Sequence, residues 1–215
     1  MYTCREIIAA IVSKNIYHAK WLNTLSMLSN NGFRRMAIGQ NSIFLNESIL
    51  KHAANKSRHA YQFKKLIGKI DGAFLPNFEQ EYLIAPIESR QYLKILDVFT
   101  CRYLTSHLEL KNSKLKDGAY LLIAHVLSIR ANELLSVYQE TLEQTESKVS
   151  IRPVVSDEME FQEEMIIQLN EFSSDWSIHA LAISTFEKKI FNNWMRSISK
   201  HLHLLNRNLI VETFQ

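Results

Sequence analysis

The sequence predicts an all-α protein. Only five Gly and three Pro occur in 215 residues, and folds rich in tight turns normally need more of both. Apolar residues also recur at spacings of three and four over long stretches, which is the period of an amphipathic helix. With 47% hydrophobic residues, the chain can bury one core, so we expect a single domain over residues 1–215.

The periodic segments fall into about six predicted helices. The first runs from near Thr3 to about Met36. A bend is expected at Gly32, because SNNGFRR weakens the helical preference locally. The second helix begins near Ser42 and ends before Gly72.

Residues 71–90 contain two prolines and are predicted to form a connection. Ser89 is placed to cap a third helix that covers residues 89–110. The sequence NSKLKDG is expected to form a turn, because it is polar and ends in Gly. The fourth helix is predicted over residues 119–146, and it should be central because it is apolar over much of its circumference.

A fifth helix is predicted over residues 154–172, and a long amphipathic sixth helix runs to near Asn206. Each half of the chain therefore has a long helix, a turn and a second helix with polar residues on its inner face. This plan indicates a four-helix bundle made of two helical hairpins, with about two additional helices.

Charge and cysteine content narrow the function classes. The formal charge is +3, and Lys and Arg alternate with Asp and Glu, so no nucleic-acid surface is expected. Cys4 and Cys101 are too isolated for a disulfide framework or a thiolate zinc site, which favours a reducing cytoplasmic location. The longest apolar run, residues 119–127, is about half of what a membrane helix needs, so no membrane span is expected.

Two histidines and a lysine lie on the apolar side of the second helix. They share one stripe with neighbouring apolar residues at spacings of three and four: Ile49, His52, Lys56, His59, Phe63 and Leu66. On the fifth helix, the same analysis places Glu158 on the inner stripe with Phe161 and Met165. Lysine and glutamate are therefore both predicted to point into the bundle.

NKSRHAYQFKKL and VVSDEMEFQEEM resemble the two signature helices of ferritin-like di-iron carboxylate proteins. Those proteins build a metal site from one Glu on each of two helices and a Glu-x-x-His on each of the other two. The resemblance covers the first, second, fourth and fifth predicted helices, and it implies a ferritin-like bundle. In the first motif, however, Lys56 precedes His59 where the family has Glu. In the second, Glu158 is present but Phe161 takes the histidine position.

The other two helices depart from the family as well. Ser29 and Ser128 stand where the resemblance places glutamates, with Glu133 as the alternative position on the fourth helix. His59 and Glu158 remain as ligand types, with Glu133 as a third candidate. Two iron ions need several carboxylates, and a protonated lysine cannot bind metal. We therefore expect a degenerate site with no metal cofactor; a single iron or manganese ion on His59, Glu133 and Glu158 is the alternative.

A charged group in a core normally finds a partner. We expect Lys56 to pair with Glu158 or Glu133, so that an ammonium stands where a metal ion would. The alternatives are that Lys56 extends to solvent over an apolar stem, and that Glu133 pairs with Arg130. His52 is expected either to hydrogen-bond to a neighbouring residue or to lie near the end of the bundle.

Three classes of function follow. The first is a non-catalytic module that binds a protein partner or a small apolar ligand, in a core cavity left by the small residues Ser29, Ser128 and Ala131. The second is an unusual oxidoreductase of the ferritin-like superfamily, metal-dependent or metal-free, that uses the residual histidine and glutamates. The third is a structural subunit, in a homodimer or with another protein. Its last helix would pack on the other chain through an apolar stripe made of Phe186, Ile190, Trp194 and Ile198.

Overall fold

The computed structural model describes residues 3–39 and 47–212, with side chains placed as far as Met36 and Leu202 in the two segments. These residues form α-helices, one short 3-10 helix at Gln80–Tyr82, and no strand, which confirms the all-α prediction. The helices are α1 (Cys4–Val12), α2 (Asn15–Gly39), α3 (Glu47–Ile67), α4 (Pro86–Leu108), α5 (Asn112–Gln144), α6 (Arg152–Phe172) and α7 (Trp176–Glu212).

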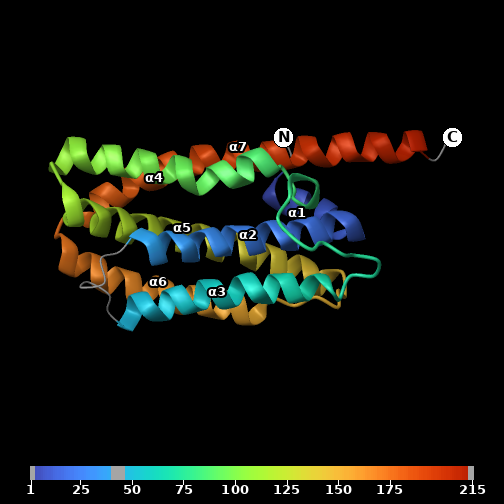
Figure 1. Cartoon of the computed structure of the whole chain (residues 1–215), viewed down its shortest axis with the longest axis horizontal. Helices are drawn as coiled ribbons and strands as arrows, with labels where there is room; N and C mark the ends of the chain where they lie inside the picture. Colours follow the sequence, from blue (N-terminus) through green and yellow to red (C-terminus); the bar gives the residue numbers. More distant parts are fainter. Residues whose placement is uncertain (1–2, 40–46, 213–215) are drawn as a thin grey trace.

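The long helices lie roughly along one axis in three layers, which are α4 with α7, α2 with α5, and α3 with α6 (Figure 1). α2 packs along α3, and α5 packs along α6, so the two predicted hairpins are present. α3 also meets α6. α4 and α7 pack against each other and against α5, and the short α1 packs on α5 at one end.

The prediction of one helix from Thr3 to Met36 is wrong. The chain breaks after α1, where the Ser13 hydroxyl donates to the carbonyl of Ala10 at 2.8 Å and competes with continuation of the helix. α2, in contrast, is one continuous helix through Gly32, where a bend was expected. The predicted start of the second helix at Ser42 lies outside the described residues.

Two other boundaries differ from the prediction. α4 begins at Pro86 rather than at Ser89, whose hydroxyl donates to the carbonyl of Ile84 inside the core at 2.8 Å. NSKLKDG forms the first turns of α5 instead of a loop. Its Gly118 is needed for close packing, because a Cβ there would lie 2.6 Å from Cζ of Phe172 on α6.

α5 is the central helix, as expected: it is buried on every side between Gly118 and Val126, and its remaining turns to Leu142 combine buried residues with partly exposed and exposed ones. Within the described residues it is also the one helix long and apolar enough to cross a membrane by length and composition. In its most apolar window 56% is buried in the fold, and the core helix of a bundle passes the same test.

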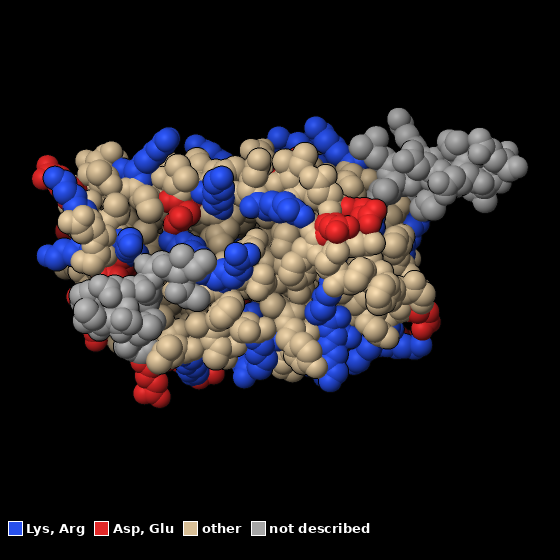
Figure 2. Space-filling model, in the orientation of Figure 1, with Lys and Arg blue, Asp and Glu red and all other residues tan. Residues whose placement is uncertain are grey.

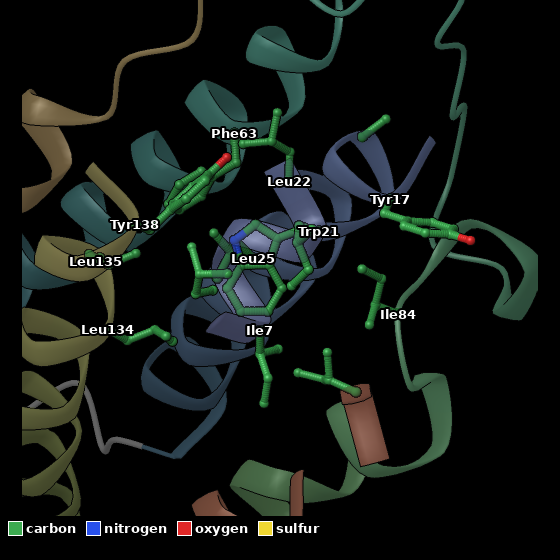
Figure 3. Packing of buried hydrophobic residues seen from close by; sticks show 14 of the residues in the cluster. Ile7, Tyr17, Trp21, Leu22, Leu25, Phe63, Ile84, Leu134, Leu135 and Tyr138 are labelled. Atoms are coloured by element: carbon green, nitrogen blue, oxygen red, sulfur yellow. The ribbon is translucent and has the colours of Figure 1, made fainter. Parts of the chain in front are cut away.

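The largest buried cluster joins α1, α2, α3, α5 and α7. Figure 3 shows Trp21 and Leu25 of α2 beside Phe63, Leu134 and Tyr138. Burying a large apolar side chain contributes about 1.5–3 kcal/mol, so this cluster stabilises the packing of these helices.

The apolar stripe of α7 packs within the chain, whereas association with another chain stays a prediction. Trp194 and Ile198 are buried, and Phe186 and Ile190 pack against the core. The Trp194 ring stacks on Trp21 with centroids 5.7 Å apart, and its Nε1 donates to Ser89.

Charged side chains are dispersed over the surface. On the face shown in Figure 2, Lys and Arg are spread over several helices rather than gathered in one area.

Candidate functional site

A mostly apolar, partly open cavity of about 170 Å³ lies between α2, α3, α5 and α6, and residues of α4 and α7 also line it. Leu25, Phe63, Leu134 and Leu135 contribute to its wall and belong to the core cluster of Figure 3. Four charged side chains also line it: Arg35, Lys56, Arg130 and Glu158. The wall of the cavity therefore combines apolar side chains with ionised ones.

Lys56 of α3 and Glu158 of α6 form an ion pair across this wall, as one of the two expected pairings predicted. The Lys56 Nζ lies 2.5 Å from Oε1 of Glu158, and their side chains are 20% and 4% exposed. Lys56 therefore does not extend to bulk solvent as the alternative supposed. Its stem lies near α2, since a Cβ added at Gly32 would be 3.9 Å from the Lys56 Cδ.

His59 holds a position between two carboxylates that are adjacent in sequence. Its Nδ1 lies 3.1 Å from Oε1 of Glu158, and its Nε2 lies 2.8 Å from Oδ2 of Asp157. Arg58 also donates to that Asp157 oxygen at 2.7 Å. The Nε2 contact is a hydrogen bond, whereas buried Nδ1 has no hydrogen-bond partner among the described residues, so its approach to Glu158 is a close contact only.

The pKa values of Glu158 and Asp157 are both lowered by the side chains that surround them. Burial by itself raises the pKa of Glu158, but the Lys56 ammonium and the neighbouring His59 outweigh it and lower the pKa below its ordinary value. The pKa of Asp157 is lowered in the same way, with burial opposed by contacts from His59 and Arg58. Oε2 of Glu158 is buried and has no hydrogen-bond partner among the described residues.

His52, one turn before Lys56, has an apolar environment. Its Nδ1 lies 2.9 Å from the hydroxyl of Tyr120 on α5, which confirms the expected hydrogen bond to a neighbour. Its ring stacks on Phe161 with centroids 3.4 Å apart. Burial, and then the nearby Lys56 charge, lower the pKa of His52, so this ring is neutral near neutral pH. Burial also raises the pKa of Tyr120.

The small residues predicted to leave space are only partly at the cavity. Ser29 and Ala131 line it, but Ser128 does not. Ser128 is buried on another side of α5, where its hydroxyl donates to the carbonyl of His125 at 2.8 Å. Periodicity misassigned this position because α5 is apolar around its circumference, so no single stripe marks the inner face.

Glu133, the third candidate ligand, is not brought together with His59 and Glu158. Its side chain is 60% exposed and pairs with Arg130 one turn earlier, which was the alternative expectation. Residues three apart on a helix are neighbours on its surface, and this local contact directs the carboxylate away from Glu158.

Sequence analysis missed a second polar cluster on the other side of the cavity. Glu187 of α7 is 1% exposed, and Arg130 donates to both of its oxygens, at 2.9 and 2.8 Å. The Tyr92 hydroxyl of α4 donates to the same carboxylate. Burial, and then the Glu187 charge, raise the pKa of Tyr92. A sequence signal existed, since Glu187 is a lone acid on the apolar stripe that carries Ile183 and Trp194.

Asp157 was also missed, although it directly precedes Glu158. Neighbouring helical positions differ by about 100° around the axis, so Asp157 does not share the inner stripe that marks Glu158. The His59 ring of α3 lies against α6, where each of its two nitrogens is close to one of the two carboxylates.

These residues do not fit the di-iron centre that the resemblance implies. His59 and Glu158 are the ligand types at the shared position, and the Lys56 ammonium lies 2.5 Å from one Glu158 oxygen, where it would repel a metal ion. Ser29 lines the cavity, and Phe161 stacks on His52. Within residues 3–36 and 47–202, no three His, Cys, Asp or Glu side chains are grouped to hold a metal ion.

Comparison with models of known protein families, with curated proteins and with solved structures found no match for this chain. The ferritin-like resemblance therefore rests only on the sequence motifs of this chain. Chemically, the site offers an amine, an imidazole and carboxylates that can exchange protons, beside an apolar space that can take a small molecule.

Proposed function

We propose that this protein is a non-catalytic ferritin-like binding module that takes a small apolar ligand into its core cavity. The observation that carries the proposal is the Lys56–Glu158 ion pair in the wall of that cavity. A fixed ammonium supplies the positive charge that metal ions supply in ferritin-like di-iron proteins. The bundle therefore keeps its inner carboxylate neutralised without a metal.

The size and lining of the cavity support an apolar ligand. An apolar cavity of roughly 150 Å³ holds one benzene-sized molecule in water. The cavity here is about 170 Å³, with leucine, phenylalanine and tryptophan side chains in its wall. Its cations are already paired: Arg35 with Asp97, Lys56 with Glu158, and Arg130 with Glu187. An anionic ligand would have to displace one of these carboxylates, whereas a neutral apolar ligand would not.

Ligand binding is tested with benzene and 1-hexanol by isothermal titration and thermal unfolding. A ligand present at ten times its Kd stabilises the folded state by about 1.4 kcal/mol. The Ala131→Phe variant fills the cavity and is expected to abolish binding while remaining folded. The matched control is Ala54→Phe on the exposed side of α3, which should bind as the parent does. Failure of both probes to bind the parent protein would overturn the proposal.

Metal content tests the proposal independently. Protein purified after growth with added iron and manganese should contain neither metal in stoichiometric amount. One or two ions per chain that disappear in His59→Ala would contradict it. That result would instead favour an oxidoreductase built on His59 and Glu158.

A further inference from the structure

Lys56 is the one lysine among the residues that line the described cavity, so it brings a primary amine to an apolar space. Primary amines of lysine condense with aldehydes and ketones to form imines. Two groups that can move protons adjoin this amine. Glu158 lies 2.5 Å from Nζ, and His59 lies 3.1 Å from the same carboxylate oxygen.

From this juxtaposition we infer that Lys56 captures an apolar aldehyde in the cavity as a protonated imine. The inference rests on the proposed function, since the aldehyde's apolar group must first enter the cavity. The inference adds covalent bond formation to the proposed binding and identifies the ligand as an aldehyde.

The reaction balances without an oxidant or a reductant. The Lys56 ammonium gives a proton to Glu158, and its nitrogen then attacks the carbonyl carbon, forming the C–N bond as the carbonyl π pair moves to oxygen. Glu158 returns the proton to that oxygen and removes one from nitrogen, which leaves a neutral carbinolamine. The protonated Glu158 then donates to the hydroxyl, the C–O bond breaks, and water leaves. The product is an iminium on Lys56 and a carboxylate on Glu158.

Charge balance favours this product in a buried site. The iminium carries the same single positive charge as the ammonium, so the Glu158 carboxylate has a cationic partner both before and after the reaction. Removing that positive charge would leave a buried carboxylate unpaired, which is strongly unfavourable. The second carboxylate oxygen, Oε2, has no partner among the described residues and can carry the proton during the exchange.

α3 supplies a matched internal control in Lys51. Its Nζ lies 2.7 and 2.6 Å from carboxylate oxygens of Glu160 and Glu164, so it too is an ion-paired lysine. Its side chain is 44% exposed and does not line the cavity. Solvent exposure alone therefore predicts faster modification of Lys51, and the inference predicts the reverse.

The full-length protein is treated with hexanal and sodium cyanoborohydride, which reduces the iminium to a stable secondary amine, and the modified peptides are located by mass spectrometry. We expect Lys56 to be modified at least about tenfold more than Lys51, a difference of about 1.4 kcal/mol in apparent reactivity. An excess of 1-hexanol should protect Lys56 and leave Lys51 unaffected. Equal or greater modification of Lys51 would overturn the inference.

The Lys56→Arg variant separates the covalent step from binding. Arginine keeps the positive charge beside Glu158 and does not form an imine, so 1-hexanol should still bind while the reducible adduct at position 56 is lost. Circular dichroism verifies that the variant is folded. If the parent binds 1-hexanol but hexanal leaves no adduct on Lys56, the inference fails and the proposed function stands. If the parent binds neither compound, both fail.

Discussion

Replacing Lys56 with Met removes the ammonium and keeps most of the side-chain volume. At the observed 2.5 Å separation from Glu158, and with an effective dielectric constant near 20, the Coulomb attraction is about 7 kcal/mol. Desolvation of both ions opposes most of this gain. Losing one partner of a buried pair typically costs 3–5 kcal/mol. His59 still contacts Glu158 in the variant, so we expect the low end, about 3 kcal/mol.

The assay is urea unfolding at pH 7, monitored by circular dichroism. Lys51→Met on the same helix is the control, because its exposed pairs should contribute at most about 1 kcal/mol. In Lys56→Met/Glu158→Met both charges are absent, and this double variant should recover much of the lost stability. A loss below about 1 kcal/mol for Lys56→Met would refute the reasoning, because it would make the pair equivalent to a surface contact.

Four further changes have defined outcomes. Burial lowers the pKa of His18 from 6.5 to about 4, so only the unfolded chain binds this proton between those pH values and stability falls as the pH drops. His18→Gln should reduce this slope by about 1.4 kcal/mol per pH unit in urea titrations, and an unchanged slope would contradict the assignment. Gly32→Ala should stabilise the protein by up to about 1 kcal/mol, because the helix gains propensity and the new Cβ meets only the Lys56 stem at ordinary distance. Gly118→Ala gains the same propensity but collides with an aromatic ring of α6, so a net loss of about 1 kcal/mol is expected, and stabilisation would show that the ring moves freely. Glu187→Gln should cost about 3 kcal/mol by leaving Arg130 partly unpaired, whereas Glu133→Gln should stay within about 0.5 kcal/mol; equal costs would contradict their burial.

The polar pair at the site was predictable because both of its helices are distinctly two-sided. On α3 and α6, charged residues alternate with apolar ones at helical spacing, so Lys56 and Glu158 stand out as ions on an apolar stripe. An isolated charge in that position requires a partner of opposite sign. The sequence therefore narrowed the choice to two carboxylates, and the three-dimensional structure selected one of them.

The second polar cluster required tertiary information. Arg130, Tyr92 and Glu187 come from α5, α4 and α7, and the hydrogen bonds to the Glu187 carboxylate span 57 and 95 positions of the chain. The apolar stripe around Glu187 marks it as inward-facing but does not identify its partners. Only the packing of α4 and α7 against α5 places them together.

The sequence by itself determined the helical class, the approximate positions of the long helices and the two inward ions of α3 and α6, because hydrophobic spacing is a local property of the chain. The tertiary structure alone decided which face of α5 borders the cavity, why Gly118 is required, and that Glu133 lies outside the site. A helix that is apolar all round carries no periodic signal for its orientation, so its rotation is fixed by the shapes of the helices that pack on it.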